Sequence, residues 1–233
     1  KCRFQNSVTT LCQLNHYKME FISPSNIFNK AWGIFQQYGS DLVVVTFVYL
    51  LISCLLSIVD TATTGANFII VFIISIACGL LQMVFALGFY RILLDTVYSE
   101  KPQLAELFNQ RNPNLILHYI IGSILAGVAI IIGFIFLIIP GIYLATRLQF
   151  FTLRLLEQEN PDCIKALTDS WNMSENHVLD LIGLGFITFC IVTLGFLALL
   201  IGLFVAIPFI SLMSTIAYDI LSKKMEKDLP LNL

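Results

Sequence analysis

An arginine stands in the middle of an apolar segment of this chain, FLIIPGIYLATRLQFF, whose other residues suit a lipid bilayer. A charge inside a membrane span is costly, so Arg147 is a candidate functional residue. Three interpretations of its guanidinium stay open. It reaches outward to the membrane surface, it forms an ion pair with Asp60, or it binds an anionic lipid headgroup or solute through its planar set of donors.

Arg147 belongs to a stripe of side chains spaced three and four residues apart, as neighbours on one helical face are. The stripe consists of Tyr143, Arg147, Phe151, Arg154 and Gln158. It should face protein or a wet cavity, because a charged side chain avoids lipid. Tyr143 and Asp60 complete the candidate site, since Asp60 is the acidic residue expected near the same face of the membrane.

A second polar group is expected at the opposite end of the predicted helices. Its members are Arg91, Asp95, Arg154, Glu157, Asp169, Asn176, His177 and Asp180. The spacing of Arg91 to Asp95 and of Arg154 to Glu157 suits ion pairs within one helix. These residues either cap helices and neutralise one another at the membrane boundary, or they line a vestibule or dock a partner.

Motifs of known catalytic chemistry are absent from the sequence. His16, His118 and His177 show no metal-ligand spacing, and HExxH, GxxxxGK[ST], GxSxG and CxxC do not occur. Phosphodiester hydrolysis would need carboxylates or histidines that converge on a metal or a general acid. We therefore expect no catalytic residues, no metal site and no cofactor, and a protein that is not an enzyme.

The composition explains why charges are informative in this chain. Hydrophobic residues make up 58% of the 233 positions and charged residues 12%, far below the soluble norm of about a quarter. The stretch from Leu181 to Tyr218 carries no charge, and as a helix it would be nearly twice the ~30 Å hydrocarbon core. The chain is therefore expected to be an integral membrane protein whose spans turn back on themselves. The net charge of −2 carries no information about nucleic acid or acidic substrates, because the placement of the charges is what matters in a membrane protein. We expect membrane lipids as partners and no nucleic acid.

Six apolar runs predict six transmembrane helices. They cover about residues 41–60, 67–92, 114–139, 141–157, 178–200 and 203–222. The three turns that close each pair contain no Lys or Arg, and every basic residue except Arg147 lies near the other side. The positive-inside rule then places both termini in the cytoplasm.

The positions of four cysteines relative to the predicted spans indicate their role. Cys54, Cys78 and Cys190 fall in apolar spans and Cys163 in a polar loop, which favours small buried side chains over disulfides. The opening KCRFQNSVTTLCQLNHYK lacks the apolar core of a secretory signal, so a loose tail or an upstream extension is expected there. The expected divisions are a disordered tail at 1–20, a six-span domain at 21–224 and a cytoplasmic tail at 225–233.

A short amphipathic segment with proline at its second position precedes each predicted hairpin. The segments are SPSNIFNKAWGIF, KPQLAELFNQ and NPDCIKALTDSW. They suit helices that lie in the membrane interface, with Trp32 and Trp171 as anchors. The alternative is that these helices pack on a partner or on neighbouring loops.

Internal repetition relates the hairpins to one another. IPGIYLATRLQF, from Ile139, is similar to IPFISLMSTIAY, from Ile207. Each unit would comprise an interfacial helix and a transmembrane hairpin, and all three would enter from the same side. The predicted fold class is therefore an all-α membrane protein of three parallel hairpin units.

Four consecutive stretches carry a resemblance to a known family. PGIYLATRLQFF, EQENPD, IKALTDSW and NHVLDLIGL together resemble a bacterial integral-membrane family of uncharacterised role, related to the membrane domain of glycerophosphoryl diester phosphodiesterases. The resemblance covers roughly residues 21–221, and its specific part is residues 140–184. In those phosphodiesterases a separate soluble barrel carries the catalysis. The resemblance thus implies a fold and a lipid-adjacent setting without an enzymatic activity.

Two classes of function follow. The first is a non-enzymatic, multi-pass inner-membrane protein that organises or binds lipids or a partner membrane protein. The second is a small permease or channel, which needs polar residues at several depths of a path. Arg147, Gln82 and His118, with scattered Thr and Ser, are the residues available for that. A homo-oligomer could assemble a pore that one chain does not show.

Overall fold

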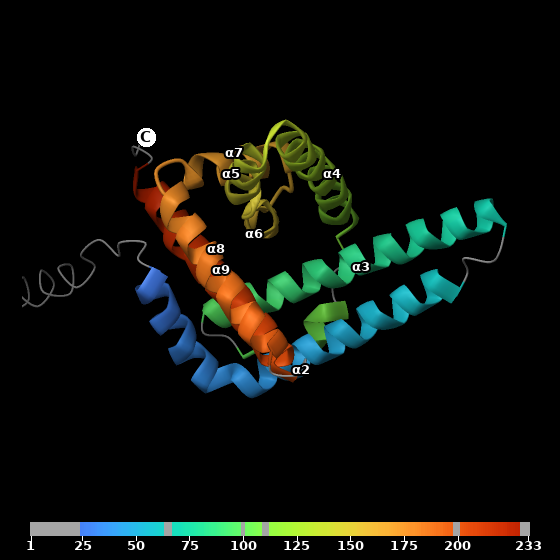
Figure 1. Cartoon of the computed structure of the whole chain (residues 1–233), viewed down its shortest axis with the longest axis horizontal. Coiled ribbons are helices and arrows are strands. Elements are labelled where there is room, and N and C mark those ends of the chain that lie inside the picture. Colours follow the sequence, from blue (N-terminus) through green and yellow to red (C-terminus); the bar gives the residue numbers. More distant parts are fainter. Residues whose placement is uncertain (1–23, 63–66, 99–100, 109–111, 198–200, 229–233) are drawn as a thin grey trace, which may run out of the picture.

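The structure is a computed structural model that describes residues 24–62, 67–98, 101–108, 112–197 and 201–228. Within these ranges the chain is helical and contains no strand, which confirms the all-α class (Figure 1). The elements are α2 Pro24–Ala62, α3 Phe68–Val97, the 3₁₀ helix η1 Leu104–Phe108, α4 Pro113–Phe136, α5 Ile138–Leu148, α6 Phe151–Glu157, α7 Cys163–Ser174, α8 Val178–Leu197 and α9 Ile201–Asp228.

Five helices of the described ranges are long and apolar enough to cross a membrane: α2, α3, α4, α8 and α9. They correspond to five of the six predicted spans, which are confirmed. Their length and composition make the chain a helical, multi-pass membrane protein.

Three groups of helices make up the molecule (Figure 1). α2 and α3 form a long antiparallel arm, α8 and α9 run side by side, and α4, α5, α6 and α7 gather in a third group. α9 joins them, because it packs against α2, α3, α7 and α8. In its most apolar stretch 61% of the residues are buried, whereas none are buried in the corresponding stretch of α3. Among the five long helices, α3 is thus the one least covered by the rest of the described chain.

The predicted fourth span, residues 141–157, is wrong as a single helix. α4 ends at Phe136, the extended Leu137 turns the chain, and α5 ends at Leu148. α6 then begins a new set of hydrogen bonds, the first from the Arg154 N–H to the Phe150 carbonyl at 3.0 Å. The apolar run is continuous through this break, so hydropathy alone carried no sign of it.

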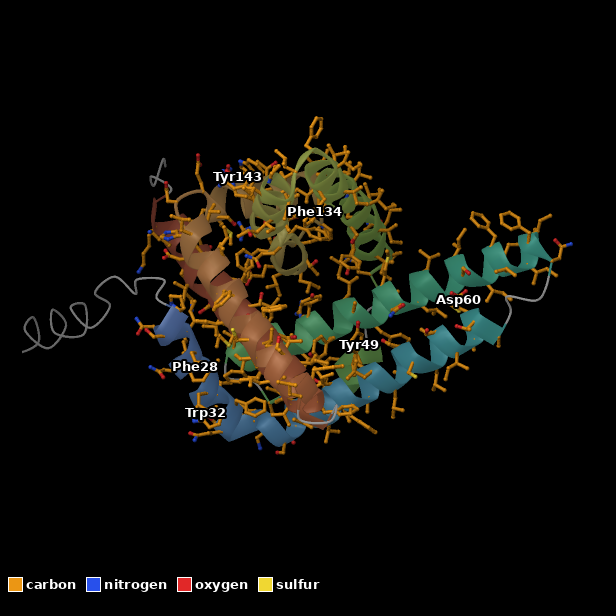
Figure 2. The ribbon with its side chains drawn as sticks, in the orientation of Figure 1. Phe28, Trp32, Tyr49, Asp60, Phe134 and Tyr143 are labelled. Carbon is orange, nitrogen blue, oxygen red and sulfur yellow. The ribbon has the colours of Figure 1, made fainter. Side chains whose placement is uncertain are left out.

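The three amphipathic segments adopt three different structures. The first is continuous with the first span as part of α2, which bends after Trp32 (Figures 1 and 2). The second contains η1, which is too short to lie along a membrane as an amphipathic helix. The third is α7, whose N-cap Asp162 accepts hydrogen bonds from the backbone of Ile164 and Lys165 at 2.9 and 3.3 Å. A separate helix before every hairpin is therefore wrong for the first unit, whereas the second has the short η1 and the third has α7.

The expected tails are only partly covered by the structure. α9 continues to Asp228, so the tail predicted at 225–233 begins as helix. The tail predicted at 1–20 and residues 229–233 lie outside the described residues.

Candidate functional site

A charged pocket lies where the ends of α3, α6 and α9 meet. Its volume is about 520 Å³, and its lining consists of Arg91, Leu94, Asp95, Tyr98, Arg154, Leu156, Glu157, Ser222, Lys223 and Glu226. Four members of the predicted polar group are therefore brought together: Arg91, Asp95, Arg154 and Glu157. The positive-inside argument placed them at one end of the helices, and the packing of α3 against α6 makes them neighbours.

Two residues of the pocket lining, Glu157 and Arg154, form hydrogen bonds to the surrounding helices. Glu157 accepts hydrogen bonds from the hydroxyls of Tyr98, at 2.7 Å, and of Tyr218. Arg154 donates through Nε to Asp169 on α7 at 2.9 Å, and its Nη1 lies 3.7 Å from Glu157. Because these groups satisfy one another, they hold α6 in place and are not free to bind a ligand strongly.

Tyr98 stays a hydrogen-bond donor at neutral pH. Partial burial raises the pKa of its hydroxyl, and the hydrogen bond to the Glu157 carboxylate raises that pKa further. The Tyr98 hydroxyl therefore does not lose its proton within the physiological pH range.

Asp219 is a buried carboxylate next to the pocket that the sequence reasoning missed. It is 2% exposed, and its oxygens lie 2.8 and 2.9 Å from the Lys223 ammonium and 3.7 Å from that of Lys30 on α2. A buried carboxylate with paired cations costs far less than an isolated one. Asp219 follows the long uncharged run and precedes Lys223 by one helical turn. This i,i+4 spacing is the sequence pattern that could have predicted the ion pair.

Three charged side chains at the rim of the pocket are accessible to a ligand. The Arg91 side chain is 49% exposed, and its Nε lies 3.6 Å from an Asp95 carboxylate oxygen. The Lys223 side chain is 57% exposed. Glu226 is exposed on the same rim. Two accessible cations beside an accessible carboxylate can bind a phosphate group and a neighbouring ammonium.

The rest of the predicted polar group lies elsewhere. His177 contacts Asp180 at 3.4 Å and the Lys224 ammonium at 2.8 Å, forming a separate cluster at the start of α8. Asn176 is exposed on the turn before α8. Four of the eight residues thus line the pocket, Asp169 pairs with Arg154 beside it, and Asn176, His177 and Asp180 lie at the start of α8.

Arg147 is held by aromatic rings inside the protein. It is 4% exposed, and its guanidinium carbon lies 4.2 Å from the centre of the Trp171 ring and 5.3 Å from that of Tyr143. Its Nη1 donates to the Trp171 carbonyl at 2.9 Å, whereas its Nε has no partner among the described residues. The arginine therefore joins α5 to α7 instead of reaching the membrane surface.

The break after α5 is stabilised at the same place. The Arg147 carbonyl lies in the last turn of α5, where carbonyls lack helical partners, and it accepts hydrogen bonds from the Ser170 hydroxyl at 2.8 Å and the Ser174 hydroxyl at 3.5 Å. α7 thus contacts both the side chain and the backbone of Arg147.

The structure does not bring Asp60 to Arg147. Asp60 accepts a hydrogen bond from Ser75 across the α2–α3 arm. Figure 2 shows it on that arm, well away from Tyr143 in the α4–α7 group. The predicted ion pair is wrong because the two spans belong to hairpins that do not pack together at this depth.

The predicted interfacial anchors differ in their surroundings. Trp32 is 50% exposed and packs edge-on against Phe209 at 6.1 Å. Trp171 instead covers the Arg147 guanidinium, so its ring has a packing partner within the protein.

A group that could bind metal occurs where α4 meets α7. Ligand atoms of His118, Asp162 and Cys163 all lie within 4.8 Å of one another. The sequence search missed this group because its members come from different hairpins.

No protein-family model, curated protein or solved structure matches this chain. The resemblance to the phosphodiesterase-related membrane family therefore stays a prediction from the residues that carry it. The charged pocket and the Arg147 cluster are the observations from which a function can be argued.

Proposed function

We propose that the chain is a bacterial inner-membrane protein with six crossings and both termini in the cytoplasm. The fourth crossing would consist of α5 and α6 together, which at ~1.5 Å per residue are long enough for the ~30 Å core. Support comes from the charged pocket, which gathers Arg91, Arg154 and Lys223 at one end of the helices. Three antiparallel pairs, α2–α3, α4–α5 and α8–α9, support the three-unit interpretation.

We propose that the protein is non-enzymatic and binds phospholipid headgroups in the charged pocket. The exposed cations at the rim, Arg91 and Lys223, carry this proposal, because in the proposed orientation they would lie at the depth of the phosphates of the inner leaflet. Arg154 and Glu157, which are paired with each other and with neighbouring helices, form the fixed part of the pocket. The resemblance to a lipid-adjacent family supports the same setting.

The first prediction concerns lipid retention. Native mass spectrometry of the gently released protein should show a phospholipid bound to the wild type and lost from the double variant Arg91→Gln/Lys223→Gln. Each charge-assisted contact contributes about 1.5–3 kcal/mol, so affinity should fall at least about tenfold per cation. The pocket lining contains as many carboxylates as cations. A phospholipid with a zwitterionic headgroup should therefore bind to the pocket as tightly as one with an anionic headgroup.

Lys165→Gln is the matched control, since Lys165 is an exposed cation of α7 outside the pocket lining. Equal lipid retention in the double variant and the wild type would contradict the proposal. Millimolar inorganic phosphate serves as competitor: displacement of the lipid signal by phosphate would assign the pocket to soluble anions instead.

A second candidate function, a small permease or channel built as a homo-oligomer, is favoured by Gln82. Gln82 is exposed in the middle of α3, on the arm that the rest of the chain leaves uncovered. No hydrogen bond within the described ranges reaches its amide, and an unpaired amide in hydrocarbon costs several kcal/mol. An amide is both donor and acceptor. Two copies in one membrane place Gln82 at the same depth and can satisfy each other across a two-fold axis.

The second prediction uses native Cys78, one helical turn before Gln82. In vesicles, a variant with Cys78 as its single cysteine should form disulfide-linked dimers on mild oxidation. Gln82→Leu should weaken association about 3- to 30-fold, the range for an interhelical polar contact in membranes. A variant with Cys190 alone, exposed on α8, is the control. Equal cross-linking through Cys190, or no effect of Gln82→Leu, would contradict assembly through α3.

A further inference from the structure

The contact between α4 and α7 places three different ligand types side by side. His118 comes from the first half of α4, and Asp162 and Cys163 from the start of α7. Their ligand atoms, a ring nitrogen, a carboxylate oxygen and a thiol sulfur, all lie within 4.8 Å of one another. The group is separate from the charged pocket, and the inference does not depend on the proposed lipid function.

Gly122 is the reason that α7 comes so close to α4. A Cβ at Gly122 would lie 3.2 Å from the Cys163 Cβ and 3.0 Å from a ring carbon of Phe151. Gly122 follows His118 by one helical turn, on the same face of α4. The missing side chain therefore lets the first residue of α7 approach the helix face that carries His118.

The ligand atoms are oriented toward one another. His118 Nδ1 accepts a hydrogen bond from the Cys163 backbone N–H at 3.4 Å, so its lone pair points at the start of α7. This bond is at the long end of the usual range and is weak. One Asp162 oxygen accepts the capping hydrogen bonds from Ile164 and Lys165, which leaves the other oxygen available. The Cys163 side chain is buried, 5% exposed, beneath them.

These ligands suit a borderline-soft divalent cation. Zinc takes Cys sulfur at about 2.3 Å and His nitrogen or carboxylate oxygen at about 2.0–2.2 Å in a tetrahedral arrangement. Ligand atoms around such an ion are roughly 3.3–3.7 Å apart, so side-chain shifts of about 1 Å would close the group around it. Calcium and magnesium prefer sets of oxygen ligands, which this group does not offer.

We propose that His118, Asp162 and Cys163 form a transition-metal site, of the type that binds zinc, which pins the start of α7 to α4. Three protein ligands leave a fourth tetrahedral position for water. The ion would add a link between two hairpin units, because α4 belongs to the second and α7 precedes the third. The competing explanation is that Asp162 only caps α7 and that Cys163 only fills the space beside Gly122.

Cobalt(II) titration of the detergent-solubilised full chain distinguishes these explanations. Cys2 and Cys12 are first replaced by serine, so that no thiol outside the described ranges competes. The thiolate–cobalt charge-transfer band in the near ultraviolet should appear and saturate at about one ion per chain. Zinc should displace the cobalt and raise the melting temperature, because a ligand that binds the folded state stabilises it.

Variants test each ligand. Cys163→Ser should abolish the band, and His118→Gln should weaken cobalt binding at least about tenfold. Cys190→Ser removes an exposed thiol of α8 and should leave the titration unchanged. Absence of the band in the parent protein, or its persistence in Cys163→Ser, would overturn the proposal. If Cys163→Ser does not fold, His118→Gln decides, and an unaltered titration curve for that variant overturns it equally.

Discussion

Replacing Gly88 with alanine should destabilise the protein by about 2 kcal/mol, within the ~1–3 kcal/mol expected for overpacking. A Cβ at Gly88 would lie 2.7 Å from the Leu107 carbonyl oxygen and 2.8 Å from its Cα. These atoms are backbone, so no side-chain rotation can relieve the clash. Either η1 moves off α3 and exposes the buried Leu107, or α3 bends. Thermal unfolding in a mild detergent measures the loss.

Gly79→Ala is the matched control on the same helix. A Cβ at Gly79 meets no atom within 4 Å, so this change should stabilise α3 by up to about 1 kcal/mol through helix propensity. On propensity alone both substitutions should be favourable. Equal melting temperatures for the two variants would show that η1 does not pack on Gly88.

The long helices could be predicted because the forces that define them are local. Uninterrupted apolar runs identified α3, α8 and most of α9, and an asparagine before α3 and before α4 caps each helix as its position suggests. Hydropathy also indicated the first span, but it could not show that the amphipathic segment before it continues into the same helix. That continuity depends on how α2 packs against α9.

The broken fourth span could not be predicted from the run of apolar residues. The break depends on Ser170 and Ser174, which lie on another helix and satisfy the carbonyl at the end of α5. The serines of α7 were visible in the sequence. The orientation of α7 against α5 was not, because it results from tertiary packing.

The charged pocket was partly predictable. Basic residues on one side of the membrane identified Arg91 and Arg154, and ordinary helical spacing identified their acidic neighbours. Tyr98 and Tyr218 were missed because a tyrosine at a helix end carries no charge pattern, and its role becomes visible only when Glu157 is seen to accept from both.

Arg147→Met should reduce the free energy of unfolding by about 2–4 kcal/mol. The change removes a stacked guanidinium, with a contribution of about 2 kcal/mol when desolvated, and leaves the buried Trp171 carbonyl without the donor that lies at 2.9 Å. Arg147→Lys should not restore stability, because a compact ammonium cannot stack over the Trp171 ring as a planar guanidinium does and donate to the carbonyl at the same time. Urea or thermal unfolding in detergent gives the values.

A double-mutant cycle distinguishes Trp171, on whose ring Arg147 stacks, from Asp60, the ion-pair partner predicted from the sequence. Trp171→Leu removes the ring but keeps the backbone carbonyl, so its coupling to Arg147→Met isolates the cation–π contact and should be about 1–2 kcal/mol. Asp60→Asn should instead add to Arg147→Met within ~0.5 kcal/mol, since the two residues share no contact. Additivity with Trp171→Leu, or coupling with Asp60→Asn, would contradict the packing of Arg147 between α5 and α7. The cycle thus tests whether the buried charge holds the break between α5 and α6 against α7, which no single substitution can show.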